Sequence, residues 1–200
     1  EETGALILDT RSAADFHKGY IPNAINIGLK GDFAPWAGSM IVDVKQPILI
    51  VSDPGTEEEV ITRLSRVGFD HVVGYLEGGF EAWKKQNNET DTVKRISPEE
   101  FEEKYSENAK VFDVRKPSEY DAEHVLNAEN KPLADISEWI GRVDKNEHFF
   151  VYCGGGYRSM IAASIFNSRG IRNFTEVEGG YGKIKETDVP KTAFVCHSKK

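Results

Sequence analysis

Cysteine is scarce in this chain: two of its 200 residues, Cys153 and Cys196, carry a thiol. Cys153 lies in a glycine-rich stretch and Cys196 in a polar tail, so their contexts do not indicate a framework of disulfide bonds. The alternative is a single Cys153–Cys196 pair. Free thiols are typical of reducing compartments, and we therefore expect the protein to be cytoplasmic.

The sequence also lacks long hydrophobic runs and an excess of basic residues. No apolar stretch approaches the roughly 18 residues of a membrane-spanning helix, and the beginning does not have the pattern of a signal peptide. The 33 acidic residues outnumber the 25 basic ones, and the net charge of −8 argues against nucleic acid or an anionic membrane as the main partner. The chain opens on Glu1-Glu2-Thr3 without a Met, which suggests a piece of a longer protein.

What the chain does contain is a repeat of itself. Four stretches recur in the second half at an offset of about one hundred residues: 5–11 as 109–115, 20–26 as 124–130, 47–53 as 147–153, and 76–80 as 177–181. Units of this size are too long for a solenoid repeat and indicate a duplicated domain. We place the boundary in the polar stretch 84–94 and predict domains over residues 1–88 and 89–200.

Each copy alternates short apolar stretches with helical patterns, which predicts an α/β fold. The apolar runs 48–51 and 149–152 lack polar alternation, as strands do in a parallel sheet that helices cover on both faces. In the second copy, Ser97-Pro98 before acidic residues is a helix-start signal. The first copy has no counterpart of residues 96–99, so we expect it to lack the first strand.

Cys153 directly follows the second of these apolar runs, and three glycines come next. Glycine lets the backbone curl so that several N–H groups can point at one anion. A helix predicted to begin near Arg158 adds the positive end of its dipole, and the arginine adds a full charge. Such a setting favours the thiolate, the nucleophilic form of cysteine. The alternative is a small buried hydrophobic residue after a strand, the ordinary role of an unpaired cysteine.

The spacing from Cys153 to Arg158 is C-x4-R. Thiol phosphatases of the C-x5-R kind have one residue more, and their wider ring holds a tetrahedral phosphate. The loop in this chain resembles the active loop of the rhodanese (sulfurtransferase) family, which carries sulfur as a cysteine persulfide. The order of motifs (Asp-x-Arg, a His-Ile-Pro-like turn, strand-Cys-loop-helix, Glu-Gly-Gly-aromatic) is similar to that of tandem rhodanese domains over essentially the whole chain.

The resemblance implies two tandem rhodanese-like domains, each a small parallel sheet flanked by helices, with no cofactor and no metal site. The chain is also similar to the C-terminal part of bacterial fusions in which rhodanese domains follow a metallo-β-lactamase-fold hydrolase of the persulfide-dioxygenase type. We therefore expect such a hydrolase as the N-terminal domain of the full-length chain. The iron-binding histidine motifs of that hydrolase are absent from this sequence. The other expected partners are a small-molecule sulfur donor and a thiol acceptor, with no nucleic acid and no membrane.

Cys153 is the expected catalytic residue. The residues expected to bind substrate, through backbone N–H groups, a hydroxyl or a positive charge, are Gly154, Gly155, Gly156, Tyr157, Arg158, Ser159 and Arg115. Among these, Arg158 is expected to hold the thiolate and the incoming sulfur anion through its fork of donors. We expect Asp113 and His124 to support the structure, with Asp113 paired to Arg115 inside the fold.

The first copy has Asp53 where the second has Cys153. An aspartate cannot carry sulfur, and its carboxylate repels anionic sulfur compounds. Pro54 removes an amide that a cradle needs, and Thr56 with Glu59 has the spacing of a capping box. We therefore expect an inactive copy with a regulatory or structural role. The alternative is Asp53 acting as a general acid or base.

The expected function is a sulfurtransferase that moves sulfane sulfur from thiosulfate or a low-molecular-weight persulfide to a thiol or cyanide through a Cys153 persulfide. Two alternatives are a small thiol phosphatase or arsenate-reductase-like enzyme, and a non-catalytic interaction module attached to a hydrolase. For Cys196, a packed C-terminal strand is favoured over a resolving thiol or a metal ligand beside His197.

Overall fold

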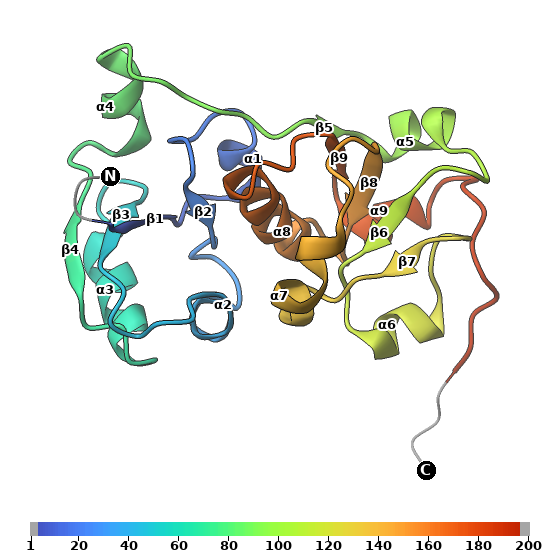
Figure 1. Ribbon diagram of the computed structural model, residues 1–200, viewed down its shortest axis with the longest axis horizontal. Helices are drawn as coiled ribbons and strands as arrows, with labels where there is room; N and C mark the ends of the chain where they lie inside the picture. The colour runs from blue at the N-terminus through green and yellow to red at the C-terminus, as the bar shows by residue number, and fades with distance from the viewer. Residues whose placement is uncertain (1–3, 197–200) are drawn as a thin grey trace. The chain divides into compact units, whose positions relative to one another are not determined.

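The computed structural model describes residues 4–196, and the chain divides into two compact units between Val93 and Lys94 (Figure 1). This division falls inside the polar stretch 84–94 where we place the boundary, with residues 89–93 in the first unit. The reason is that the chain returns to the first unit: Asp91 forms an antiparallel bridge with Tyr20, and the buried Val93 donates its N–H to the carbonyl of His17.

The first unit is a parallel sheet of four strands in the order β2-β1-β3-β4. The strands are β1 (Leu6–Asp9), β2 (Ile25–Asn26), β3 (Ile48–Val51) and β4 (Val72–Tyr75). The helices are α1 (Ala13–Phe16), α2 (Phe33–Met40), α3 (Glu57–Ser65) and α4 (Gly79–Lys85). Figure 1 shows α1 and α4 on one side of the sheet and α2 and α3 on the other.

The second unit repeats this plan with one strand more, in the order β5-β9-β8-β6-β7. The strands are β5 (Arg95–Ile96), β6 (Val111–Asp113), β7 (Glu129–Asn130), β8 (Phe149–Tyr152) and β9 (Phe174–Val177). The helices are α5 (Pro98–Lys104), α6 (Pro117–Ala122), α7 (Ile136–Trp139), α8 (Tyr157–Ser168) and α9 (Gly180–Ile184), with 3-10 turns η1 (Leu133–Asp135) and η2 (Ile140–Arg142). Two parallel-sheet α/β units with flanking helices are thus present, as predicted. Within residues 4–93 no strand corresponds to β5, as predicted.

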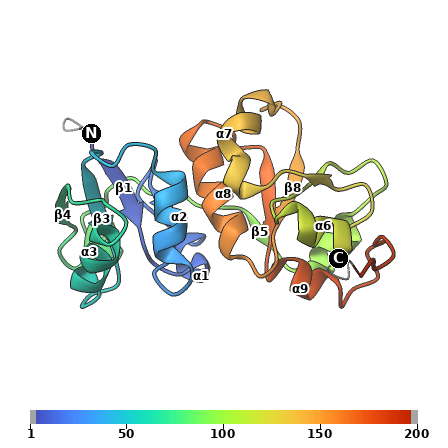
Figure 2. The same cartoon turned by 90° about the horizontal axis from the view of Figure 1, so that it is seen from below.

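Local sequence explains where the main elements begin and end. Ser97 caps α5 and forms a capping box with Glu100. The apolar run Phe149–Tyr152 becomes the central strand β8, and all four of its residues are buried. Figure 2 shows α7 and α8 on one side of this sheet and α6 and α9 on the other, the two-sided cover that such a strand requires.

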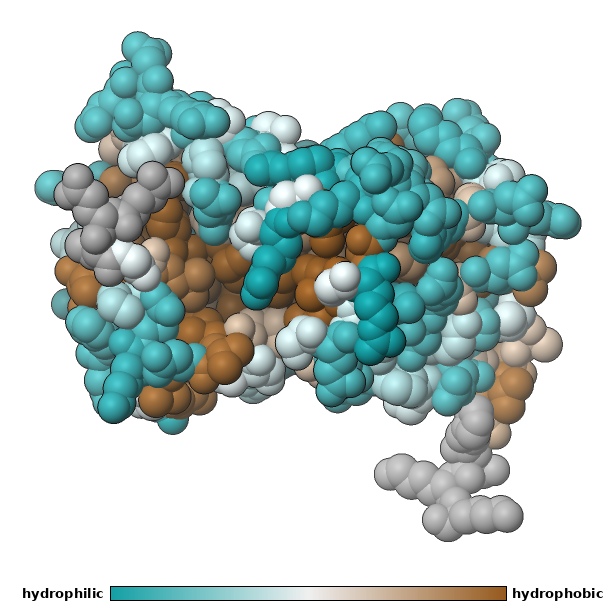
Figure 3. All heavy atoms as spheres, viewed as in Figure 1, coloured by the Kyte–Doolittle hydropathy of each residue, from teal (hydrophilic) through white to brown (hydrophobic). Residues whose placement is uncertain are grey.

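The surface is largely hydrophilic in the view of Figure 3, with hydrophobic residues showing between the polar ones. Among residues 4–196, no helix combines the length and the apolar character that crossing a bilayer requires. The predicted C-terminal strand is wrong for the part that the structure describes. Residues 192–196 have no regular secondary structure, and Phe194 and Val195 are exposed. This segment forms single hydrogen bonds, such as the one from the Val195 N–H to the carbonyl of Ala122, and no strand pairing.

Candidate functional site

Cys153 lies at the carboxyl end of β8, between the ends of the neighbouring strands β6 and β9. In a parallel sheet this edge collects the turns that lead into helices, and it is where such folds place their chemistry. The chain passes from Cys153 through the three glycines and enters α8 at Tyr157, one residue before the predicted start. The predicted strand, loop and helix are therefore all present.

Groups of the loop and of the helix contact the sulfur directly. The N–H of Gly156 donates to Cys153 Sγ at 3.1 Å, and Ser159 Oγ lies 3.4 Å from Sγ. Gly156 has a φ of 93°, a left-handed conformation in which a side chain is strained, so glycine is needed for the amide to turn inward. Cys153 itself is 1% exposed. The sulfur thus sits in a closed polar niche and not in hydrocarbon.

The helix that follows adds its field to this niche. α8 has 12 residues, Gly156 is its N-cap, and no acidic residue lies in its first turn. Its partial positive charge therefore faces Sγ without a fixed carboxylate to cancel it. In the first unit, the corresponding helix α3 carries Glu57, Glu58 and Glu59 in its first turn.

The Glu-Gly-Gly motif of the second unit holds the loop from behind. The N–H of Tyr181 donates to the carbonyl of Cys153 at 2.6 Å, and the N–H of Gly182 donates to that of Gly154 at 2.9 Å. A Cβ on Gly180 would lie 2.3 Å from the Cys153 carbonyl oxygen, so only glycine permits this approach. The motif serves to fix the backbone that presents the sulfur.

Arg158 points to a carboxylate. Its guanidinium forms a two-pronged ion pair with Glu119 on α6, with N–O distances of 2.6 and 2.9 Å. The hydrogen bonds from Arg158 lower the pKa of Glu119 below its ordinary value. The positive charge predicted to serve the sulfur anion is therefore shared with an acidic partner that the sequence analysis did not identify.

A buried carboxylate approaches the sulfur from β9 through Ser159. Ser159 Oγ donates to Glu176 Oε1 at 2.6 Å, and Arg95 Nε donates to Glu176 Oε2 at 2.6 Å. Burial raises the pKa of the Glu176 carboxyl, and the hydrogen bonds and charge of Arg95 oppose part of that effect. Neither Glu176 nor Arg95 was predicted as a site residue. The signal available in the sequence was a glutamate between the threonine and the valine of a short stretch, Phe174–Val177, whose four residues are all buried.

Arg115 and Asp113 form an internal ion pair. Arg115 binds both carboxylate oxygens of Asp113, donates to the carbonyl of Glu123, and lies 4.2 Å over the ring of Tyr181. Arg115 is 5% exposed and Asp113 is fully buried. All these contacts are with other residues of the second unit, so the guanidinium of Arg115 points into the interior of the protein.

The first unit repeats this pair contact for contact. Arg11 binds both oxygens of Asp9, donates to the carbonyl of Gly19, and lies 4.2 Å over Phe80. A feature shared by the copy with a cysteine and the copy without one belongs to the architecture.

His124 lies just after α6, and Tyr157 begins α8. The His124 ring stacks on Tyr120 at 3.6 Å, and its Nδ1 forms a hydrogen-bond contact with the Tyr120 carbonyl at 2.7 Å, so both ring contacts are with a residue one turn earlier in the chain. Tyr157 is half-buried at the start of α8, and Gly155 is exposed at the tip of the loop.

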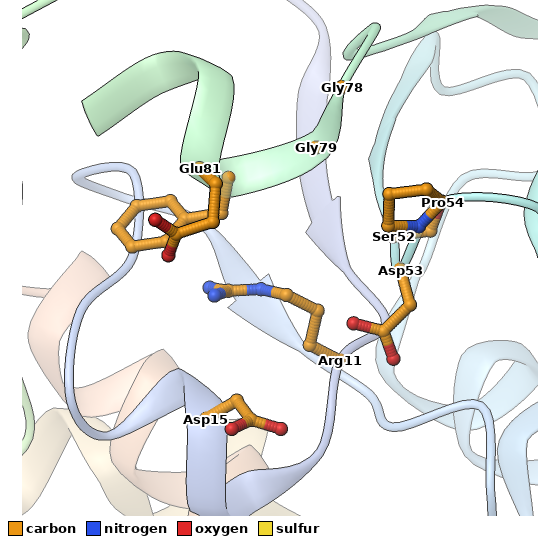
Figure 4. Close-up of a pocket in the computed structure, with 9 residues that line it drawn as sticks. Arg11, Asp15, Ser52, Asp53, Pro54, Gly78, Gly79 and Glu81 are labelled. Atoms are coloured by element: carbon orange, nitrogen blue, oxygen red, sulfur yellow. The ribbon is translucent and has the colours of Figure 1, made fainter. Parts of the chain in front are cut away.

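At the equivalent place in the first unit, Asp53 lies at the end of β3 beside a cavity of about 320 Å³. Figure 4 shows the guanidinium of Arg11 in this cavity between Glu81 and Asp15, with Asp53 and Pro54 at its other side. The three carboxylates make it an unfavourable place for thiosulfate or a persulfide anion.

The predicted capping box of α3 is wrong. Thr56 is the N-cap, but its hydroxyl donates to the carbonyl of Asp53, and Glu59 pairs with Arg63 one turn further along. The carboxylate of Glu57 instead accepts from the N–H of Gly55. A side chain from the first turn of α3 therefore accepts a hydrogen bond from a backbone N–H of the loop between β3 and α3.

Cys196 is free and exposed, and His197 lies outside the described residues. Over residues 4–196, no three side chains of His, Cys, Asp or Glu are grouped so that they could hold a metal ion.

Comparisons with known proteins agree with this architecture. The model of the family described as rhodanese-like domain matches residues 1–86 and 97–187. The chain is similar to the thiosulfate sulfurtransferase PspE of Escherichia coli, with 40% identity over 82 residues that cover 40% of this chain and 75% of the relative. It is also similar to the thiosulfate sulfurtransferase GlpE of Pseudomonas entomophila, with 31% identity over 100 residues that cover 50% of this chain and 92% of the relative.

Among solved structures, a rhodanese-like domain protein from Staphylococcus aureus is 28% identical, with a TM-score of 0.43 and coverage of 46% of this chain and 91% of that one. The family matches show a sulfurtransferase kind of protein and account for both units. The chain belongs to the rhodanese-like domain family and contains two such domains in tandem.

Proposed function

We propose that the second unit transfers sulfane sulfur through a persulfide on Cys153, with thiosulfate or a low-molecular-weight persulfide as donor and a thiol or cyanide as acceptor. The observation that carries the proposal is the Gly156 N–H on Cys153 Sγ at the N-terminal end of α8. A donor hydrogen and a helix dipole at one sulfur stabilise a negative charge there, and sulfur transfer needs such a charge at each stage.

The cycle has two displacements. The Cys153 thiolate attacks the outer sulfur of thiosulfate, the S–S bond of the donor breaks, and its electron pair leaves with sulfite. The outer sulfur of the new Sγ–S⁻ group holds the negative charge. An acceptor thiolate then attacks that outer sulfur, the bond to Sγ breaks, and the electron pair returns to Cys153. No net oxidation occurs. The backbone N–H groups of the loop stabilise the negative charge on sulfur in both displacements.

We propose that the first unit is catalytically inactive. Asp53 replaces the thiol, and the glutamates of α3 cancel the positive end of the helix. The cytoplasmic location and the metallo-β-lactamase-fold partner domain stay predictions from the sequence.

The test is the intact mass of the protein after exposure to thiosulfate or glutathione persulfide, in a Cys196→Ser background so that Cys153 is the single thiol. We expect the parent to gain the mass of one sulfur atom, to lose it again with cyanide, and the Cys153→Ser variant to gain nothing. A parent that stays unloaded while it hydrolyses p-nitrophenyl phosphate would instead identify a thiol phosphatase.

A further inference from the structure

A continuous hydrogen-bonded chain leads from the sulfur into the protein interior. Cys153 Sγ lies 3.4 Å from Ser159 Oγ, Ser159 Oγ lies 2.6 Å from Glu176 Oε1, and Glu176 Oε2 accepts from Arg95 Nε at 2.6 Å. The side chains of Ser159 and Glu176 are fully buried, and that of Arg95 is 7% exposed. The groups come from α8, β9 and β5, so the fold brings them together and no local motif does.

The number of protons in this chain is limited. The Ser159 hydroxyl has one hydrogen, and an ionised carboxylate can only accept. When Glu176 is ionised and paired with Arg95, the Ser159 hydrogen goes to Glu176, and the oxygen of Ser159 faces Sγ as an acceptor for the thiol proton. When Glu176 is protonated, it donates to Ser159, and Ser159 donates to a thiolate at Sγ. In each state every hydrogen along this series has an acceptor, and the thiol, hydroxyl and carboxyl groups together carry one negative charge.

The state with two negative charges is the unfavourable one. Thiolate and carboxylate would then compete for one hydroxyl hydrogen, and the two charges would repel each other in a site closed to water. Burial already raises the pKa of Glu176, in the direction that favours holding a proton there. Charged groups near these three side chains include Glu178, 3.7 Å from Arg95, and the Arg158–Glu119 pair, whose arginine directly precedes Ser159 on α8.

We infer that Glu176 is a positioning residue that exchanges the Cys153 thiol proton through Ser159 and shares one negative charge with the sulfur, so that an ionised Glu176 opposes the thiolate and a protonated Glu176 permits it. In this step the thiol proton moves to Ser159 Oγ, the Ser159 proton moves to Glu176 Oε1, and the negative charge passes from the carboxylate to the sulfur. No bond between heavy atoms changes. The inference rests on the proposed function and deepens it, since it names the group that controls ionisation of a cysteine that is 1% exposed.

The first unit gives an internal comparison. Aligning the two copies by their repeated stretches places Asp53 at Cys153, Glu59 at Ser159 and Tyr75 at Glu176. Glu59 pairs with Arg63 on its own helix, and Tyr75 is half-exposed on β4. The copy without the thiol has therefore lost the other two members of the chain as well.

The test is the pH dependence of Cys153 alkylation by iodoacetamide, in the Cys196→Ser background. We expect Glu176→Gln to lower the midpoint by about one pH unit, because the thiolate no longer meets a competing carboxylate. Glu178→Gln is the matched control: it is the same change two residues further along, on an exposed side chain that also faces Arg95, and it should leave the midpoint in place.

Ser159→Ala separates a relay from a bare charge effect. In the Ser159→Ala background, Glu176→Gln should lower the midpoint much less than it does with Ser159 present, a coupling that a double-mutant cycle measures. An unchanged midpoint in Glu176→Gln, or an equal lowering with and without Ser159, would overturn the inference.

If the Glu176→Gln variant does not fold, a second measurement still tests the coupling between Glu176 and the thiol. The 13C resonance of the Glu176 carboxyl should move again at the pH where the thiol ionises in the Cys196→Ser protein, and should show one step in Cys153→Ser/Cys196→Ser. Identical titrations would refute the coupling. Alkylation and NMR use no sulfur donor, so a protein that passes these tests and fails to load sulfur would refute only the proposed function.

Discussion

Replacing Gly180 by alanine tests whether the loop behind Cys153 is held as the contacts indicate. The added Cβ would lie 2.3 Å from the Cys153 carbonyl oxygen, where real contacts essentially never fall under 3.0 Å. Gly180 also has a φ of 56°, and a side chain costs about 1 kcal/mol in this region. The backbone shift that relieves the overlap costs roughly 1–3 kcal/mol more. We therefore expect a loss of about 2–4 kcal/mol in the stability of the second unit.

The same shift should disturb the chemistry. Relieving the clash moves the Cys153 carbonyl and weakens its 2.6 Å hydrogen bond from Tyr181, and the sulfur moves with the backbone that bears it. At temperatures where the variant is fully folded, we expect sulfur loading from thiosulfate to fall by roughly tenfold, the effect of about 1.4 kcal/mol on a barrier. Denaturant unfolding and the rate of mass gain measure the two effects.

The first unit supplies the control for this substitution. A Cβ on Gly79 would lie 2.8 Å from the Ser52 carbonyl oxygen, at a φ of 61°. Gly79→Ala should therefore destabilise the first unit by a similar mechanism and leave sulfur loading unchanged. The reasoning fails if Gly180→Ala keeps the second unit within about 0.5 kcal/mol of the parent, the range of a neutral surface change.

Two further predictions concern charges near the loop. Glu119→Gln removes the partner of Arg158, so thiosulfate should bind better, with a KM lower by roughly fivefold for about 1 kcal/mol of regained attraction. Asp121→Asn, an exposed change on the same helix, should leave KM unchanged, and equal KM values for all three proteins would contradict the role given to Arg158. Burial lowers the pKa of His148 below its ordinary 6.5, so the unfolded chain binds more protons just below that pH. The second unit should therefore lose stability as pH falls through 6.5, and His148→Asn should remove that part of the loss in thermal unfolding between pH 7.5 and pH 5.5.

The sequence predicts those parts of the fold and site that depend on neighbouring residues. The duplication, the parallel sheets, the strand before Cys153 and the helix after it all follow from local patterns, and the helix start at Ser97-Pro98 is where its capping residues place it. The predicted capping box at Thr56 fails although its residues have the right spacing. The reason is that a threonine hydroxyl can either accept from a backbone N–H later in the sequence or donate to a backbone carbonyl earlier in it. Here the Thr56 hydroxyl donates to the carbonyl of Asp53.

Partners that are distant in sequence could not be predicted from these patterns. Arg158 and Glu119 are 39 residues apart, and Arg95 and Glu176 are 81 apart. Each pair forms because the order of strands and helices brings two elements to one edge of the sheet, which no spacing within the sequence encodes. The boundary falls within the predicted stretch 84–94, and its place near the end of that stretch has the same cause, since the bridge between Tyr20 and Asp91 ties the chain to the first unit.

The duplication separates what the fold needs from what the chemistry needs within one chain. Both units keep the Asp-x-Arg pair over an aromatic ring and a Gly-Gly turn pressed on the backbone behind the central strand. The second unit alone combines the thiol, the helix start free of acidic residues and the buried Ser159–Glu176–Arg95 chain. Because the shared features support a sheet edge with or without a thiol, they cannot by themselves generate a nucleophile. Transferring the activity to the first unit would therefore require the features found only beside Cys153. A thiol introduced at position 53 alone would face the glutamates of α3 and the carboxylates of the cavity, and would remain unreactive toward anionic sulfur compounds.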